Sequence, residues 1–154
     1  MMARSHVVFG ISAWAGLSAI SALVPSFAGF WGVILGALLP DIDHPSSTVG
    51  RPLFFISKPL ARLTGHRTVT HSLLGFSVLL SCLYLTDSMT LFGKGLLCGV
   101  ASHLVGDFLT KGGIPLFWPI KFRIAFPIAF VAGGVVESVV VYAFAALIAG
   151  MIFF

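Results

Sequence analysis

Two of the five acidic side chains in this 154-residue chain fall within one short stretch that also carries a histidine. The stretch reads Leu-Pro-Asp-Ile-Asp-His-Pro, and its ionisable residues are Asp41, Asp43 and His44. Two carboxylates beside an imidazole are costly to bury unpaired, and a divalent metal ion is the simplest partner for them. Taken alone, the stretch is equally typical of a polar loop after a helix, because Pro40 and Pro45 both break helices.

A second pair of ionisable residues, His103 and Asp107, is spaced four positions apart. On a helix this spacing puts both side chains on one face, one turn apart. An imidazole nitrogen and a carboxylate oxygen placed in this way can bind a single metal ion. In a soluble protein a packing hydrogen bond would be the more frequent explanation, but ionisable residues at membrane depth favour a functional role.

The third cluster contains His66, Arg67 and His71. The two histidines are five positions apart, so they do not fully share a helix face. Arg67 could hold an anionic group such as a phosphate through bidentate hydrogen bonds. An equally weighted alternative is that Arg67 only anchors a helix end on the cytoplasmic side.

These clusters, together with a histidine near the N-terminus, give a set of candidate site residues. The expected metal ligands are His6, Asp43, His44, His71, His103 and Asp107. We expect Asp41, His66 and Arg67 to act in catalysis. The set is larger than one tetrahedral ion requires, which predicts either two ions or some residues that orient ligands or transfer protons.

The ligand types narrow the choice of metal. Histidine and aspartate without cysteine suit Zn, Mn or Mg better than the metals of thiolate sites. The two cysteines, Cys82 and Cys98, lie inside apolar segments and are interpreted as small hydrophobic residues. We therefore expect one or two divalent ions held by nitrogen and oxygen.

Composition indicates the elements that must position these residues. The chain is 58% hydrophobic and 9% charged, its mean hydropathy is +1.06, and several apolar stretches approach the roughly 20 residues that span a bilayer. We predict one all-α domain over residues 1–154, a polytopic membrane bundle of about five transmembrane helices. The expected helices cover residues 6–24, 26–39, 68–85, 91–109 and 124–154, with an interfacial or re-entrant segment at 45–65.

The basic residues predict the orientation. If the N-terminus is cytoplasmic, five spans leave Lys94 alone on the outer side and place the other Lys and Arg residues inside. The same topology places all five histidines and three of the four aspartates toward the cytoplasmic side, which predicts one site there. Glu137 is expected deep in the last helix. The net charge of +4 is scattered over helix ends, so we expect a lipid partner and no nucleic acid.

Taken together, the motifs resemble the bacterial inner-membrane YdjM family over most of the chain. The motifs are Leu39-Pro40-Asp41-Ile42-Asp43-His44-Pro45, Gly65-His66-Arg67, Thr70-His71-Ser72-Leu73-Leu74, Ser102-His103 with Asp107, and Leu116-Phe117-Trp118-Pro119. The resemblance implies a membrane-bound, metal-dependent hydrolase in the inner membrane, in a family with a LexA-regulated member.

The expected activity is hydrolysis, with water activated by the metal as nucleophile and a phosphoester or lipid headgroup as substrate. Transport or sensing of metal ions or protons is the alternative, with Glu137 as a relay in the middle of the membrane. A purely structural membrane protein is the third possibility, but it would leave the ionisable clusters without a role.

Overall fold

The computed structural model describes residues 1–21, 26–65, 68–120 and 122–153. Within these residues the chain forms six α-helices and two short 3-10 segments, and the all-α prediction is confirmed. The α-helices are α1 (Ala3–Ile20), α2 (Phe27–Leu38), α3 (Phe54–Thr64), α4 (Leu73–Leu85), α5 (Leu91–Phe108) and α6 (Val135–Phe153). The 3-10 segments are η1 (Leu39–Asp43) and η2 (Val69–His71).

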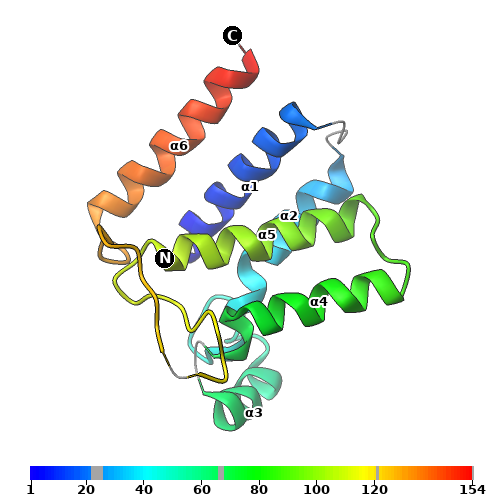
Figure 1. Cartoon of the computed structure of the whole chain (residues 1–154), viewed down its shortest axis with the longest axis vertical. Coiled ribbons are helices and arrows are strands. Elements are labelled where there is room, and N and C mark those ends of the chain that lie inside the picture. Colours follow the sequence, from blue (N-terminus) through cyan, green and yellow to red (C-terminus); the bar gives the residue numbers. More distant parts are fainter. Residues whose placement is uncertain (22–25, 66–67, 121, 154) are drawn as a thin grey trace.

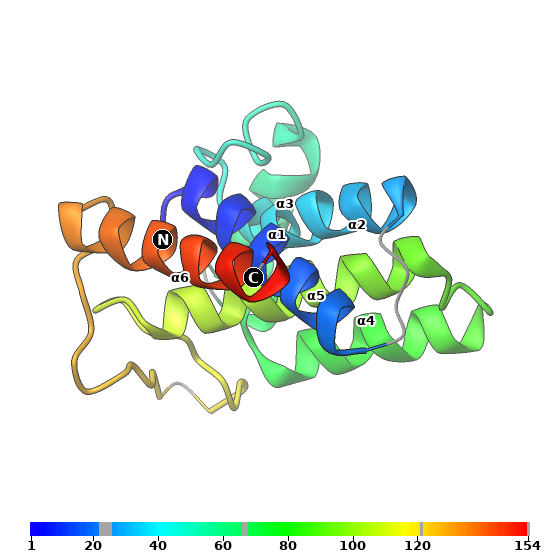
Figure 2. The same cartoon turned by 90° about the horizontal axis from the view of Figure 1, so that it is seen from above.

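Helix α5 lies at the centre of the molecule (Figure 1). It packs against α1, α2 and α4, and it lies between α2 and α4 when the molecule is seen from above (Figure 2). Helix α6 packs along α1 on the outside. The ends of α1, α2 and α5 that carry the predicted site residues therefore come together around the two 3-10 segments.

The most extensive packing between described helices joins α2 and α5 through glycines. A Cβ atom on Gly36 would lie 2.1 Å from the carbonyl oxygen of Leu96, and one on Gly99 would lie 2.3 Å from that of Val33. No side chain fits at these positions, so the glycines allow the two backbones to touch, as small residues do between membrane helices. This contact fixes the C-terminal end of α2 against the middle of α5.

Side-chain caps and proline explain where several elements begin. The hydroxyl groups of Ser26, Ser72 and Thr90 accept backbone N–H bonds at the N-termini of α2, α4 and α5, as expected for good N-cap residues. Pro40 lies in the first turn of η1, where its missing N–H costs nothing and stops α2 from continuing. The acidic stretch is consequently held in a tight 3-10 turn.

The last helix begins later than the sequence analysis predicted. It starts at Val135, whereas residues 124–134 form an irregular segment with isolated bridges. Pro127 lacks a backbone donor, and Gly133 has a φ of 78°, which ends any helix there. Glu137 consequently lies in the first turn of α6, so the prediction that it lies well inside the last helix was wrong.

The helix predicted at residues 68–85 is also shorter than expected. Helix α4 starts at Leu73, and the residues just before it form η2, so His71 lies in a 3-10 turn and not on a long helix. The end of the predicted first helix, at 22–24, falls outside the described residues.

Among the described helices, α6 has both the length and the apolar character needed to cross a membrane, whereas α4 is apolar but shorter. The number of spans therefore stays a prediction. Helix α3 occupies the segment expected at the interface. It exposes Phe54, Phe55 and Leu63 beside the charged Lys58 and Arg62, a composition typical of helices that lie on a membrane surface.

Candidate metal centre

Six ionisable side chains from four elements meet at one end of the bundle. Helix α1 contributes a histidine, η1 two aspartates, η2 a histidine, and α5 a histidine and an aspartate: His6, Asp41, Asp43, His71, His103 and Asp107. Five of them are fully buried at 0% exposure, and the Asp41 side chain alone retains 18%. A cluster this buried requires charge compensation within itself or from a bound cation.

The orientation of His103 is set by the backbone of α2. Its Nδ1 atom lies 2.7 Å from the carbonyl oxygen of Ala37. Since a carbonyl can only accept, Nδ1 carries the proton and donates it. The lone pair of Nε2 then points into the cluster, where Nε2 lies 3.2 Å from Nε2 of His71.

His71 is oriented in a similar way from η2. Its Nδ1 atom lies 2.9 Å from the Thr70 hydroxyl and 3.6 Å from Oδ2 of Asp43, and that hydroxyl donates to Asp43. Asp43 therefore faces the Nδ1 side of His71, away from His103. A histidine held by a carboxylate at one nitrogen is the usual arrangement of a metal ligand at its other nitrogen.

Two carboxylates face the converging Nε2 atoms. Oδ1 of Asp41 lies 3.7 Å from Nε2 of His71 and 3.8 Å from Nε2 of His103. Oδ2 of Asp107 lies 3.6 and 3.8 Å from the same two atoms. Two imidazoles and two carboxylates thus surround one point.

These contacts change the protonation of the groups in the 3-10 segments. Burial alone would lower the pKa of His71, but the Asp41 and Asp43 carboxylates more than offset it, and its pKa lies above the ordinary histidine value. Burial also opposes ionisation of Asp41, yet His71 and His103 hold the pKa of Asp41 below its ordinary value. The two histidines therefore favour the ionised form of the Asp41 carboxylate.

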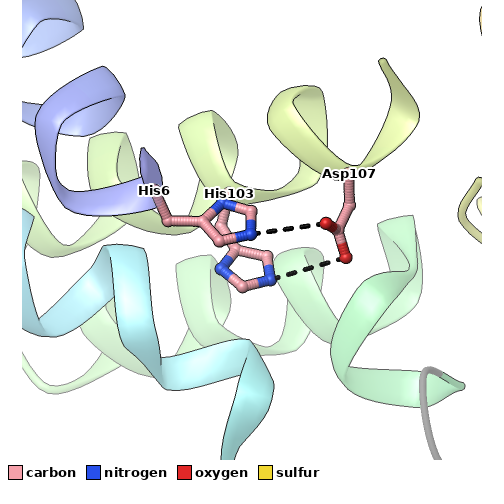
Figure 3. Close-up of side chains that lie close together, drawn as sticks. All are labelled: His6, His103 and Asp107. Atoms are coloured by element: carbon pink, nitrogen blue, oxygen red, sulfur yellow. Dashed lines mark ion pairs between the residues drawn. The ribbon is translucent and has the colours of Figure 1, made fainter. Parts of the chain in front are cut away.

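A second group forms on the other side of Asp107. Nε2 of His6 lies 3.3 Å from Oδ1 of Asp107, and the N-terminal amino group of Met1 contacts the same oxygen. The ring of His6 stacks on that of His103 with centroids 3.7 Å apart, and Figure 3 shows both rings facing Asp107. Gly106 gives His6 this room, because a Cβ atom there would lie 3.2 Å from its Nδ1.

The geometry fits a metal ion. Two nitrogen ligands bound at 2.0–2.1 Å to a tetrahedral ion lie about 3.3 Å apart, close to the 3.2 Å between the two Nε2 atoms. Among the described residues, two groups have ligand atoms that all lie within 4.8 Å of one another: Asp41, His71 and His103, and His6, His103 and Asp107. Asp107 directs Oδ1 toward His6 and Oδ2 toward His71, an arrangement suited to a carboxylate shared between two ions.

The remaining predicted residues lie elsewhere or outside the described chain. His44 is half-buried, and its Nδ1 lies 2.9 Å from the Ser46 hydroxyl, so it is not part of either group. His66 and Arg67 fall outside the described residues, and their roles stay predictions.

Sequence reasoning missed two residues that support the cluster. The Thr70 hydroxyl, which is not among the predicted site residues, contacts both Asp43 and His71. Glu137 accepts the backbone N–H groups of Met2 at 3.0 Å and Gly133 at 2.8 Å, and so links α6 to the start of α1. The glycine pair before Glu137 was the available signal for its place at a helix start.

The fold and the cluster define a class: an all-α protein with many exposed large apolar side chains and a buried histidine–aspartate group that could hold a metal ion. The family described as YdjM inner membrane protein matches residues 1–154. The chain therefore belongs to the YdjM family, and the expected family is confirmed.

Individual relatives agree with this assignment. Inner membrane protein YdjM of Escherichia coli strain K12 is 42% identical over 143 residues, which cover 83% of this chain and 70% of the relative. The uncharacterized protein YvsG of Bacillus subtilis strain 168 is 33% identical over 91% of this chain and 87% of its own. No solved structure matches the chain. The family and relatives identify an inner-membrane protein associated with the lipid bilayer.

Proposed function

We propose that this protein is a membrane-bound, metal-dependent hydrolase whose metal centre lies at the cytoplasmic end of the bundle. The observation that carries the proposal is the pair of Nε2 atoms of His71 and His103, 3.2 Å apart. Each imidazole is bonded at Nδ1 to an acceptor or hydroxyl, so both lone pairs converge on one point. Two imidazole lone pairs in contact repel unless a proton or a metal ion lies between them.

The proposed ligands of the first ion are Asp41, His71, His103 and Asp107. Asp43 then orients His71 through Nδ1, whereas the sequence analysis predicted Asp43 as a metal ligand and Asp41 as a catalytic residue. A second ion would use His6 and the other oxygen of Asp107. A bound divalent cation would supply Lewis acidity and lower the pKa of a water molecule toward neutrality.

The protein groups around the ions would direct the reaction. Asp41 is the least buried member of the cluster, so its carboxylate is the one that can take a proton from water arriving from outside. His66 and Arg67 remain the predicted acid–base and anion-binding residues. A centre at the membrane surface suits an amphiphilic substrate, a phosphoester or a lipid headgroup.

The transport alternative required a carboxyl in the middle of the membrane. Glu137 instead lies in the first turn of α6 and is bonded to backbone groups near the start of α1. The described ionisable residues in the cluster lie at one end of the bundle and do not form a path across it. This arrangement favours hydrolysis at a surface over transport.

The test is a hydrolysis assay on protein purified in detergent, with soluble phosphoesters and phospholipids as substrates. We expect activity that a chelator removes and that added Zn or Mn restores, and a loss of at least about 100-fold in His103→Ala. The control is Lys94→Ala, in the first turn of α5, about 13 Å along the helix from His103. Activity that persists at full rate in His103→Ala, or no activity in the metal-loaded protein on either substrate class, would contradict the proposal.

A further inference from the structure

A pocket of about 470 Å³, lined by both polar and apolar residues, adjoins the metal centre. It lies between the first turn of α1 and the turn that follows η1. Its polar lining consists of Arg4, Asp41, His44, Ser46, Ser47 and Thr48. This size lies within the range of small-molecule sites in proteins.

Asp41 belongs to both the cavity and the metal centre. The other four cluster residues of the two groups, His6, His71, His103 and Asp107, are completely buried. Asp41 keeps 18% of its side chain exposed and lines the cavity. A molecule in the cavity would therefore reach the metal centre at Asp41.

The charge of the lining selects for an anion. Arg4 is exposed and forms no ion pair within the described part of the chain. A second guanidinium lies beside the lining residue Ser46, because Nε of Arg51 donates to the carbonyl oxygen of Ser46 at 3.0 Å. Asp41 is the one acidic group in the lining, and its charge would be neutralised by a bound cation. The cavity thus presents positive charge beside the metal centre.

The turn that forms the far wall is held rigidly. The Ser47 hydroxyl donates to the carbonyl oxygen of Asp41 at 2.7 Å and accepts the Gly50 N–H at 2.8 Å. A Cβ atom on Gly50 would lie 1.9 Å from the carbonyl oxygen of His44, so the turn can close only on glycine. Ser46 and Thr48 are exposed on this fixed turn and offer hydroxyl donors.

The start of α1 adds donors of its own. The first helical amides that bond back along the chain are those of Ser5 and His6, both to the carbonyl oxygen of Met2. The N–H groups of Ala3 and Arg4 have no acceptor among the described residues. Unpaired amides at the positive end of an 18-residue helix attract an anion.

We propose that this cavity binds the phosphoryl group of the substrate, with Arg4 as the main anion-binding side chain among the described residues. A guanidinium fork, two hydroxyl groups and helix amides on separate walls suit a tetrahedral oxyanion better than a planar carboxylate. The proposal rests on the proposed hydrolase function for its role in a reaction, but anion binding itself can be tested separately.

In the experiment, inorganic phosphate is titrated into zinc-loaded protein in nanodiscs of zwitterionic lipid, and isothermal calorimetry measures its affinity. We expect Arg4→Ala to weaken phosphate binding at least tenfold and to leave metal content unchanged, while Arg4→Lys retains part of the affinity. Arg62→Ala, which removes an exposed arginine on α3 outside the cavity, is the matched control and should bind as the original does. Unchanged phosphate affinity in Arg4→Ala, or acetate binding as tightly as phosphate, would overturn the proposal.

Two further measurements follow. One distinguishes a lipid headgroup from a soluble phosphoester as the source of the phosphoryl group, and the other distinguishes failure of the anion site from failure of the hydrolase proposal. Competition by phosphatidic acid in the nanodisc would support a lipid headgroup, competition by glycerol phosphate alone would support a soluble phosphoester, and competition by neither would overturn the assignment. If the protein binds no metal, the hydrolase proposal fails, yet phosphate binding that depends on Arg4 in the metal-free protein would still support the anion site. If the original protein binds metal but does not bind phosphate, the anion site is overturned and the hydrolase proposal is not.

Discussion

Asp41 and Asp43 are two positions apart in the chain, yet they face opposite nitrogens of His71. Asp41 lies 3.7 Å from Nε2 and Asp43 lies 3.6 Å from Nδ1. In a 3-10 helix of about three residues per turn, side chains two positions apart point roughly 120° away from each other. The tight turn in η1 thus separates a residue that faces the metal centre from one that supports His71 from behind.

This separation predicts different losses in two single variants. We expect Asp41→Asn to reduce metal affinity at least about 100-fold, because it weakens a direct ligand, and Asp43→Asn to reduce it by about 10–100-fold, because it only loosens the orientation of His71. The measurement is competitive titration of zinc against a chromogenic chelator. A larger loss in Asp43→Asn than in Asp41→Asn would restore the ligand assignment made from the sequence.

The residues of the cluster were largely predictable, but their individual roles were not. Few ionisable residues occur in so apolar a chain, and their agreement in depth on separate helices pointed to one site. The identity of the atom that each carboxylate faces depends on the 3-10 conformation of η1, which the pattern of residues does not encode. The supporting carbonyl of Ala37 was also invisible in the sequence, because every residue has one.

At the scale of the elements, the glycine contact between α2 and α5 positions the imidazole of His103. It places the carbonyl oxygen of Ala37 at 2.7 Å from Nδ1 of His103. Gly36 is the position where an added Cβ would come closest to the partner backbone, at 2.1 Å from the carbonyl oxygen of Leu96. The orientation of His103 should therefore depend on a residue that does not touch it.

We predict that Gly36→Ala separates the two helices and lowers the free energy of unfolding by about 1–3 kcal/mol. Metal affinity should fall with it. Gly150→Ala is the matched control, since a Cβ there meets nothing within 4 Å and alanine is the better helix former. Thermal unfolding in detergent measures both variants, and an equal melting temperature for Gly36→Ala and the original protein would refute the contact.

Glu137 joins two elements next to the site, and its replacement tests that role. We expect Glu137→Ala to leave the Met2 and Gly133 N–H groups without an acceptor and to reduce stability by about 1–3 kcal/mol for each donor that water does not reach. Glu137→Gln retains a carbonyl oxygen and should lose less. Thermal unfolding compares the stability of the two variants. Uptake of metal ions into liposomes tests the transport alternative: uptake that the original protein supports and Glu137→Gln abolishes would favour transport.

The elements themselves were predicted unevenly. The boundaries of α2 and α5 follow directly from their caps, Ser26 and Thr90, and from the polar residues beyond their ends. The late start of α6 was missed because residues 124–134 are as apolar as the helix that follows. Pro127 and the pair Gly133 and Gly134 indicated a break before the helix, but the prediction of its start relied on the hydropathy of the segment.

At the scale of the whole molecule, the proposed orientation places the metal centre on the cytoplasmic side. It assumes five crossings, with the loop around Lys111 inside and the end of α6 outside. A reporter inserted in that loop should behave as cytoplasmic, and one fused behind α6 should behave as periplasmic. A cytoplasmic signal behind α6 would mean an even number of crossings, and the short α2 would be the first helix to reconsider.

The central claim is that the buried histidine–aspartate cluster binds metal, and elemental analysis of the purified protein tests it most directly. Protein taken from membranes without added chelator should contain one or two equivalents of a divalent metal such as Zn or Mn. The double variant His71→Ala with His103→Ala should remain in the membrane and contain almost none, because both converging nitrogens are gone. A metal-free original protein that also fails to take up Zn, Mn or Mg, or a double variant with full metal content, would contradict the account.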